Sequence, residues 1–312
     1  MEKRRVGSLR VSVAGLGCNN FGRRLDAYQS AAVVHAALDA GVTFFDTADI
    51  YGTVDGERRG EEFLGRALGS HRKDVVLATK FGMAAGGGPG SAHPDYVRRS
   101  AEESLRRLGT DRIDLYQLHI PVPDVPIADT LGALDELVWE GKVREIGCSN
   151  FSAAQLREAE GAVRDGGARF VSVQNEYSLL HRDPESGVLE ESIKAGLAFL
   201  PYFPLASGLL TGKYRRGQPA PAGSRLAGEK GSGSFTHENV TIVERLIGFA
   251  AEQDHTLLEL ALSWLRQRPQ VASVIAGATT PEQIRANVAA TTSWQLSEAE
   301  LARVDELTSP PG

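Results

Sequence analysis

Short apolar runs of strand length alternate along the chain with stretches that have a helical period. The runs predict eight strands, at residues 12–15, 43–46, 75–80, 114–119, 143–149, 170–174, 198–202 and 271–275. Helices are expected between them, at residues 30–40, 60–68, 94–108, 127–140, 152–160, 187–195, 240–253, 257–268 and 281–290. Buried hydrophobic strands separated by helices are typical of a parallel sheet covered on both faces. Eight such units favour a closed (β/α)8 TIM barrel over two open sheets, since this fold typically takes about 250 residues.

Three segments fall outside this alternation. Residues 4–6 and 9–11, joined by a Gly-Ser turn, are expected to form an N-terminal β-hairpin. The glycine-rich residues 86–90 predict a loop after the third strand, and residues 206–237 predict a long loop after the seventh. Loops of such length are often lids or ligand-binding segments, so the second loop is a candidate to cover a ligand.

The composition is that of an ordinary globular protein, with 42% hydrophobic and 24% charged residues. Because no linker divides the sequence, we expect residues 1–312 to form one domain.

The formal charge of −6 and the scattered basic residues argue against a nucleic-acid partner. No stretch reaches the length of a membrane-spanning helix and the charged start lacks a signal peptide's apolar core, so we expect a cytoplasmic protein without a membrane partner. Cys18 and Cys148 form no disulfide or zinc pattern and are expected to be reduced.

Polar residues gather where the predicted strands end, which is where a TIM barrel has its active site. These residues are Gly17, Cys18 and Asn19, then Asp46 and Tyr51, Lys80, His119, Ser149 and Asn150, Gln174 and Asn175, Tyr202, and Gly277. Taken singly, a strand-end tyrosine, lysine or histidine is more often a structural or surface residue. Together they form a polar mouth whose desolvation requires a ligand. The combination therefore indicates a binding site.

Several motifs stand in the order found in a known enzyme family. They are FDTADIYG (45–52), ATKFG (78–82), LYQLHIP (115–121), GKVREIGCSNF (141–151), QNEYS (174–178), LLTGKY (209–214) and GATTPEQIRAN (277–287). Over nearly the whole chain this sequence resembles the aldo-keto reductase superfamily, most of all its bacterial group that includes proteins similar to potassium-channel β-subunits. The resemblance implies reduction of an aldehyde or ketone to an alcohol, or the reverse reaction, with a nicotinamide coenzyme. It assigns the catalytic tetrad to Asp46, Tyr51, Lys80 and His119.

The chemistry of these four side chains agrees with the roles that the resemblance implies. Carbonyl reduction needs a hydride from the coenzyme and a proton for the oxygen, and the Tyr51 phenol can supply the proton. The pKa of a free phenol is about 10, and a neighbouring Lys80 ammonium is expected to lower it while Asp46 holds Lys80 in place. A neutral His119 would donate a hydrogen bond to the substrate oxygen and orient the carbonyl.

The resemblance also implies which residues bind the coenzyme. Ser149, Asn150 and Gln174 would hold the nicotinamide carboxamide, and Tyr202 would stack beneath the ring. The expected set also includes Gly17, Cys18, Asn19 and Asp46. For the pyrophosphate the resemblance implies Pro204, Leu205, Ser207, Gly208 and Lys213. For the adenosine it implies Gly277, Thr279, Gln283 and Asn287. Residues 278–283 contain no Arg or Lys to bind a 2′-phosphate. NADPH is therefore expected from the family, with NADH as an open alternative, and no metal site is expected.

Other functions are excluded or left open by the same residues. A Rossmann dehydrogenase would need a third glycine at the fixed spacing after Gly15 and Gly17, and the sequence has none at that spacing. A metal-dependent or Schiff-base barrel enzyme, such as an isomerase or aldolase, would need different strand-end residues. A cofactor-binding regulatory subunit of the channel β-subunit type and an NAD-dependent sugar dehydrogenase stay open. The physiological substrate, which is expected to be a small carbonyl or alcohol, the reaction direction and the oligomeric state are also left open.

Overall fold

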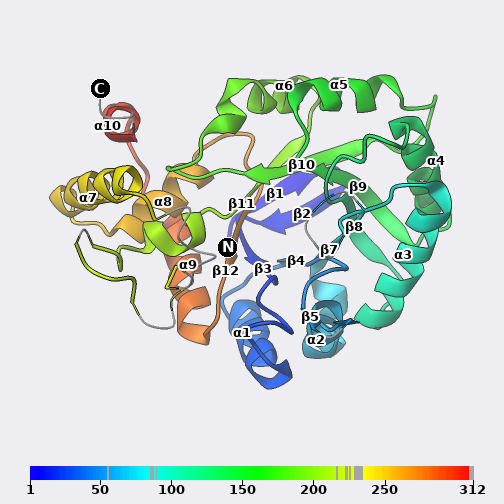
Figure 1. Cartoon of the computed structure of the whole chain (residues 1–312), viewed down its shortest axis with the longest axis horizontal. Coiled ribbons are helices and arrows are strands. Elements are labelled where there is room, and N and C mark those ends of the chain that lie inside the picture. Colours follow the sequence, from blue (N-terminus) through cyan, green and yellow to red (C-terminus); the bar gives the residue numbers. More distant parts are fainter. Residues whose placement is uncertain are drawn as a thin grey trace.

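Eight parallel strands form one curved sheet at the centre of the part of the chain that the computed structural model describes, residues 1–54, 56–84, 88, 90–215, 217–221, 224, 226–227 and 235–308 (Figure 1). In sheet order they are β11 (Ala198–Tyr202), β10 (Phe170–Glu176), β9 (Val143–Ser149), β8 (Ile113–Leu118), β7 (Val76–Phe81), β4 (Phe44–Asp46), β3 (Ala14–Gly17) and β12 (Val274–Gly277). Because every pair is parallel, the carboxyl ends of all the strands lie at one end of the sheet.

The two outermost strands of this order meet and close the sheet into a barrel. The amide of Phe199 in β11 donates to the carbonyl of Gln270 at 2.8 Å, and the carbonyl of Phe199 accepts from the amide of Ala272 at 3.0 Å. These contacts stand immediately before β12. The (β/α)8 TIM barrel predicted from the alternation is therefore confirmed.

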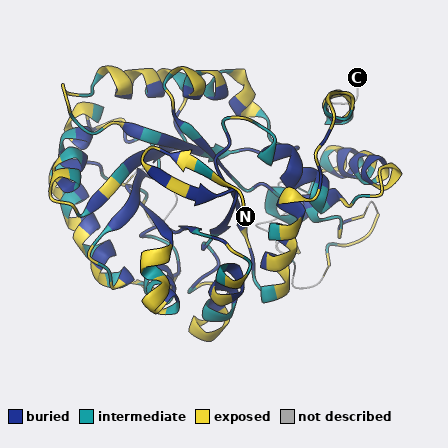
Figure 2. Ribbon diagram, turned by 180° about the vertical axis from the view of Figure 1, so that it is seen from behind, coloured by how far each residue is buried: buried dark blue, intermediate teal, exposed yellow. Residues whose placement is uncertain are grey.

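Helices surround the barrel (Figure 1): α1 to α6 pack in chain order, as do α7 to α9, while α9 also packs against α1 and α10 packs against α7. They are α1 (Ala27–Asp39), α2 (Gly60–Leu68), α3 (Pro94–Leu108), α4 (Ile127–Trp139), α5 (Ala153–Gly161), α6 (Val188–Lys194), α7 (His237–Glu252), α8 (Leu257–Arg266), α9 (Pro281–Thr292) and α10 (Glu298–Thr308), with short 3-10 helices η1 (Gly69–Asp74), η2 (Asp183–Ser186) and η3 (Ala206–Thr211). Figure 2 shows their outward faces exposed and the strands buried. This amphipathic pattern places the hydrophobic core between the helices and the barrel.

The predicted N-terminal hairpin is present and covers one end of the barrel (Figure 1). Its strands are β1 (Lys3–Val6) and β2 (Leu9–Ser12). Three hairpin side chains, those of Val6, Leu9 and Val11, are buried against residues that begin or line the barrel strands, such as Phe44 and Val76. Because the hairpin covers the amino-terminal ends of the strands, the open end is the one at which the strands finish.

Two adjacent strands begin two to three residues later than the sequence pattern predicts. The prediction was 12–15 and 271–275, whereas β3 spans Ala14–Gly17 and β12 spans Val274–Gly277. Ser12 belongs to the hairpin, and its hydroxyl donates to the carbonyl of Ala14 at 2.7 Å, so the chain turns there before it enters the barrel. The two strands pair with each other and are therefore displaced together. The other six predicted strands differ from the observed bounds by at most two residues.

Some elements were not predicted from the pattern. A small hairpin of β5 (Thr53–Val54) and β6 (Glu57–Arg58) stands between β4 and α2, and α10 follows the last barrel helix. The start of α10 carries a capping box, in which the amide of Ser297 donates to Glu300 and the Ser297 hydroxyl accepts from the Glu300 amide. Most of the predicted loop at 86–90 and part of the loop at 206–237 lie outside the described residues.

Candidate active site

Asp46 and Lys80 form a buried ion pair at the open end of the barrel. Asp46 is the last residue of β4, and Lys80 lies near the end of the neighbouring strand β7. Lys80 Nζ donates to Asp46 Oδ2 at 2.5 Å and to the carbonyl of Thr47 at 2.9 Å, and both side chains are almost completely buried. Desolvation would lower the pKa of Lys80, but the charge of Asp46 and the phenol of Tyr51 outweigh it and raise that pKa. The lysine therefore keeps its charge inside the barrel.

The rings of Tyr51 and His119 stand beside this pair. Tyr51 lies five residues beyond β4, and its ring centroid is 5.3 Å from Lys80 Nζ. His119 directly follows β8, where its amide donates to the carbonyl of Phe81 at 2.8 Å. The two rings make an edge-to-face contact with centroids 5.9 Å apart and 78° between their planes. The structure thus brings together all four residues that the resemblance assigns to the tetrad.

His119 is held as a neutral imidazole. It is 6% exposed, and burial together with the nearby Lys80 charge lowers its pKa from 6.5 to about 3. Within the described residues, its Nδ1 atom is buried and makes no hydrogen bond. A buried polar atom without a partner is costly and is usually explained by a ligand, water or function. A neutral imidazole can donate one hydrogen bond to an oxygen placed beside it.

The pKa of Tyr51 is raised, which corrects the expectation that Lys80 lowers it below its ordinary value. Burial of the phenol is the largest cause, the Lys80 charge opposes it, and the Asp46 charge adds to it. Asp46 sits 2.5 Å from the lysine and cancels much of its field, so burial dominates. Tyr51 is therefore a protonated phenol next to a charged lysine, which is the state of a proton donor.

Two glutamine side chains hold the second carboxylate oxygen of Asp46. Gln174 Nε2 donates to Asp46 Oδ1 at 2.9 Å, and Gln117 Nε2 donates to the same atom at 3.2 Å. The Gln174 amide also donates to Gln117 Oε1 at 3.3 Å. Gln174 was predicted as a site residue and Gln117 was missed. Gln117 stands two residues before His119, so the period of two along β8 was the signal that could have found it.

The ends of β9, β10 and β11 form a connected polar group. Asn150 Nδ2 donates to the carbonyl of His119 at 2.9 Å and to Ser149 Oγ at 3.1 Å, while Asn150 Oδ1 accepts from the Tyr202 hydroxyl at 2.8 Å. The Ser149 hydroxyl donates to the carbonyl of Gln174 at 2.7 Å. The predicted residues for the nicotinamide thus lie directly beside the Tyr51 and His119 end of the barrel. Asn175, also noted at a strand end, donates to the carbonyl of Phe151 at 3.0 Å.

The loop after β11 contains a run of unusual backbone conformations. Pro204 is buried and Leu205 is partly buried, and they lead into Ser207 and Gly208 with φ of 58° and 101°. A Cβ on Gly208 would lie 3.6 Å from both Lys213 Nζ and the Tyr214 hydroxyl. That hydroxyl is buried and has no hydrogen-bond partner in the described part of the chain. The amides of Ala206 and Gly208 donate within the loop, to the carbonyls of Phe203 and Leu205, and Lys213 supplies an exposed cation beside it that suits an anion.

The predicted adenosine residues lie at the start of α9. The Thr279 amide donates to Gln283 Oε1 at 2.8 Å, and Asn287 Nδ2 donates to the carbonyl of Gly277 at 3.4 Å. Gly277 is exposed and pairs with Gly17 across the β12–β3 ladder. The side chains of Gln283 and Asn287 thus fix the turn into the helix. On the same helix, Arg285 Nη1 lies 3.9 Å from Glu282 Oε1.

The residues after β3 contribute mainly through their backbone. The Cys18 thiol is buried, is not in a disulfide, and its amide donates to the carbonyl of Asp46 at 2.8 Å. Asn19 is partly exposed, and its Oδ1 lies 3.6 Å from where a Cβ of Gly277 would be. Asn20 was not predicted, yet it is buried and donates to the carbonyl of Ala278 at 3.3 Å. Asn20 therefore ties the β3 loop to the start of α9.

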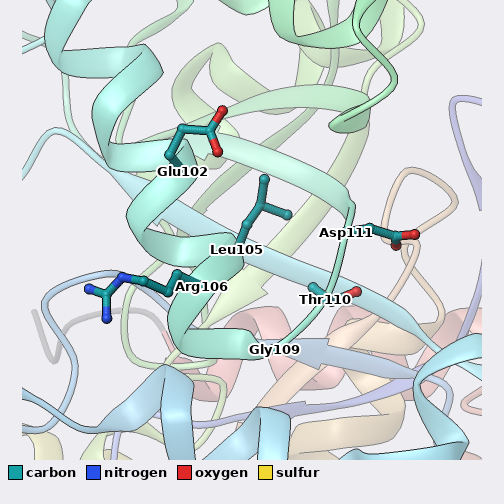
Figure 3. Close-up of a pocket in the computed structure, with 6 residues that line it drawn as sticks. All are labelled: Glu102, Leu105, Arg106, Gly109, Thr110 and Asp111. Atoms are coloured by element: carbon teal, nitrogen blue, oxygen red, sulfur yellow. The ribbon is translucent and has the colours of Figure 1, made fainter.

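A surface pocket lies far from these residues (Figure 3). It is lined by Glu102, Leu105, Arg106, Gly109, Thr110 and Asp111, at the carboxyl end of α3. This segment leads into the beginning of β8, so the pocket is at the closed end of the barrel.

Among the described residues, no group of three or more His, Cys, Asp or Glu is arranged to hold a metal ion. The same residues include no helix long and apolar enough to cross a membrane.

Comparison with known proteins identifies the family. Residues 14–309 match the model of the Aldo/keto reductase family. This chain belongs to that family. It is 31% identical over 310 residues to the L-glyceraldehyde 3-phosphate reductase of Escherichia coli strain K12, covering 96% of this chain and 89% of the relative. It is 34% identical over 304 residues to the probable aldo-keto reductase 1 of Glycine max, covering 95% and 85%.

A third relative extends the comparison to almost the full length of both proteins. The uncharacterized oxidoreductase YqkF of Bacillus subtilis strain 168 is 33% identical over 316 residues, covering 99% of this chain and 97% of the relative. Aldo/keto reductases in general carry out NAD(P)H-dependent carbonyl reduction. Membership of the family therefore makes this chain an oxidoreductase.

Proposed function

We propose that the protein reduces an aldehyde or ketone to an alcohol, or runs the reverse oxidation, with Tyr51 as the general acid and base. The observation that carries this proposal is the buried Lys80–Asp46 pair with the Tyr51 ring on one side and a neutral His119 beside it. A charged lysine, a protonated phenol and a neutral imidazole at three adjacent strand ends suit the protonation of a developing alkoxide.

The reduced nicotinamide supplies a hydride to the carbonyl carbon when it is bound. Tyr51 then gives its hydroxyl proton to the carbonyl oxygen, and the Lys80 ammonium stabilises the phenolate that remains. Asp46 keeps Lys80 in place through the 2.5 Å bond, and Gln174 and Gln117 keep Asp46 in place. Neutral His119 donates a hydrogen bond to the substrate oxygen and so orients the carbonyl carbon. In the reverse direction the phenolate accepts the alcohol proton.

The polar residues around this centre suit a dinucleotide. The side-chain oxygens of Ser149, Asn150 and Gln174 keep lone pairs that can accept from a carboxamide NH2 group, and the ring of Tyr202 is available for stacking on a nicotinamide. For the pyrophosphate we propose the segment from Pro204 to Gly208 together with Lys213. The unpartnered Tyr214 hydroxyl beside Gly208, stated for the described residues, supports a polar ligand at this place.

For the adenosine end we propose Gly277, Thr279, Gln283 and Asn287, with Gly17, Cys18 and Asn19 beside them. Thr279 and Gln283 lie at the N-terminus of α9, a place that favours negative charge. NADPH is the proposed coenzyme because it is the family's expected donor. NADH is the alternative, since residues 278–283 carry no basic side chain and Arg285 already faces Glu282.

A fluorescence titration of the purified protein with NADPH and with NADH tests the proposal, followed in the same cuvette by a panel of aldehydes, ketones and sugars. Tight binding of one coenzyme and its oxidation on addition of a carbonyl support the proposed function. Binding without turnover of any carbonyl or alcohol contradicts it and favours a regulatory subunit. Absence of binding for both coenzymes refutes the coenzyme assignment as well.

A further inference from the structure

A second group of buried charges lies on the outer side of β7, behind Lys80. Thr79 precedes Lys80 on the strand, so its side chain points away from the barrel interior. The Thr79 hydroxyl donates to Glu61 Oε1 at 2.6 Å, and Arg107 Nε of α3 donates to Glu61 Oε2 at 2.7 Å. Glu61 is only 1% exposed. A buried carboxylate with both oxygens bonded fixes α2 to β7 and α3 at one point.

The residue before Glu61 is bonded to Tyr51. The amide of Gly60 donates to the carbonyl of Tyr51 at 3.0 Å, and a Cβ on Gly60 would lie only 2.7 Å from that oxygen. The Tyr51 backbone therefore lies directly against the first turn of α2. Two consecutive residues of this turn thus connect Tyr51 to the strand that carries Lys80.

Asp49 completes the group on the side of the Tyr51 loop. Its amide donates to the carbonyl of Lys80 at 3.0 Å, and its buried Oδ2 lies 3.4 Å from Arg58 Nη1. Its Oδ1 is buried and has no hydrogen-bond partner among the residues described. Burial and the charge of Glu61 raise the pKa of Asp49 to about 7, while Arg58 and Arg107 oppose the shift. The Tyr51 loop is thus bonded to β7 through the Asp49 amide, and its buried carboxyl lies within the electrostatic range of Glu61 and Arg107.

We propose that Glu61 is a positioning residue that fixes Tyr51 relative to Lys80 through the first turn of α2. Glu61 does not touch the substrate. Its ion pair with Arg107 and its bond to Thr79 set the depth at which α2 lies against β7, and the Gly60 amide transmits that position to Tyr51. The inference rests on the proposed function, because it concerns the residue that transfers the proton. A displacement of about 1 Å at such a group can lower a rate on the order of a hundredfold.

Steady-state kinetics of Glu61→Gln and Thr79→Val test the inference. Glu61→Gln keeps the size of the side chain but removes the charge that faces Arg107, and Thr79→Val removes only the hydroxyl that holds Glu61. Both are expected to lower kcat on the order of tenfold or more while coenzyme Kd and substrate KM stay within about twofold. Thr79→Ser, which restores the hydroxyl, is expected to recover most of the loss. Glu62→Gln, on the next residue of α2 at the surface, is the matched control.

The outcomes separate this inference from the proposed function. An unchanged kcat in both Glu61→Gln and Thr79→Val, with a large loss in Tyr51→Phe, overturns the positioning role alone. A wild-type kcat in Tyr51→Phe overturns the proposed function. Should Glu61→Gln fail to fold, the Thr79→Val and Thr79→Ser pair decides, because the valine matches threonine in size and both test the same bond. A loss in Thr79→Val that serine does not restore also contradicts the inference.

Discussion

The ring of Tyr51 lies edge to face against the ring of His119, with centroids 5.9 Å apart. The same ring lies beside the Lys80 ammonium, whose Nζ is 5.3 Å from the ring centroid. The backbone of Tyr51 is fixed separately, by bonds to Ala48 and Gly60. Removal of the hydroxyl alone therefore leaves the ring where it is, and the chemistry of the hydroxyl can be tested without disturbing the geometry around it.

Tyr51→Phe is expected to keep coenzyme binding and to lose most carbonyl reduction. General acid catalysis by a positioned side chain contributes about 10²- to 10⁴-fold, and this variant removes the only proton that the ring can give. Stopped-flow measurement of coenzyme oxidation at saturating carbonyl gives the rate, and coenzyme fluorescence gives the Kd. Turnover close to that of the wild type would show that Tyr51 is not the proton donor.

Lys213→Ala is expected to weaken coenzyme binding by about tenfold, which corresponds to about 1.4 kcal/mol, with little change in the rate of the chemical step. The lysine is exposed beside Gly208, so its contribution to phosphate binding is electrostatic and should shrink at high salt. Titrations at low and high ionic strength measure both effects. Lys194→Ala, on the surface of α6, provides the control for loss of one positive charge. Equal affinity for wild type and Lys213→Ala contradicts the assignment.

His119 is expected to stay neutral down to pH 4 in the folded protein. Burial and Lys80 lower its pKa to about 3, so the unfolded chain binds a proton near pH 6.5 that the folded protein does not. This residue therefore destabilises the fold as the pH drops below about 6.5. Long-range ¹H–¹⁵N NMR of histidine-labelled protein measures its charge, and His119→Gln assigns the signal. A His119 signal that titrates between pH 5 and 7 refutes the expectation.

Asp49→Asn is expected to stabilise the protein at high pH. A carboxyl group whose pKa rises from 3.8 to about 7 on folding favours the folded state below about pH 4, and that advantage is lost as the pH rises through 7. Asparagine does not ionise. The free energy of unfolding of Asp49→Asn, relative to that of the wild type, should therefore rise by about 3 kcal/mol from pH 5 to pH 9. Urea unfolding at both pH values measures the difference. Asp124→Asn, at an exposed loop position, is the control for the loss of one carboxylate, and a pH-independent difference for Asp49→Asn would contradict the raised pKa.

Two helical glycines are expected to respond in opposite directions to alanine. A Cβ on Gly65 in α2 would lie 2.1 Å from the carbonyl oxygen of Leu108, so Gly65→Ala should separate α2 from α3 and cost about 3 kcal/mol or more. Gly248 in α7 is exposed, and a Cβ there meets no atom of the described residues within 4 Å. Gly248→Ala should therefore stabilise the helix by about 0.5–1 kcal/mol. Thermal unfolding of both variants checks the pair, and a shared direction would contradict the packing.

Much of the barrel could be predicted from hydrophobic period alone. The ranges 143–149 and 198–202 match β9 and β11 because each is a single apolar run between clear helical stretches. The position of β3 could not be predicted, because the hydroxyl of Ser12 and the hairpin pairing decide where the strand starts. Those contacts join residues whose relation is visible only when the chain is folded. A period of two locates a strand but does not fix its first residue.

The candidate site could be located from the rule that the active-site residues of a TIM barrel lie at the carboxyl ends of its strands. That rule placed Asp46, Lys80 and His119 together before any distance was known. The sign of the Tyr51 pKa shift could not be predicted, because it depends on how closely Asp46 approaches Lys80 and how deeply the phenol is buried. Glu61 was missed for a related reason. Its partners Thr79 and Arg107 are far away in the sequence, and a glutamate in the first turn of a helix is ordinarily a surface residue.

The join between β11 and β12 bears on the order in which the protein can assemble. The backbone of Phe199 bonds to Gln270 and Ala272 at this join, and Arg4 of the hairpin donates to the carbonyls of Arg266 and Val271 beside it. Arg4 and Val271 are 267 residues apart in the sequence, so the bond between them cannot form until residue 271 has been made. The hairpin can pack on Phe44 and Val76 as soon as β4 and β7 exist, but its bonds at the join complete only with the last strand, as non-local contacts do.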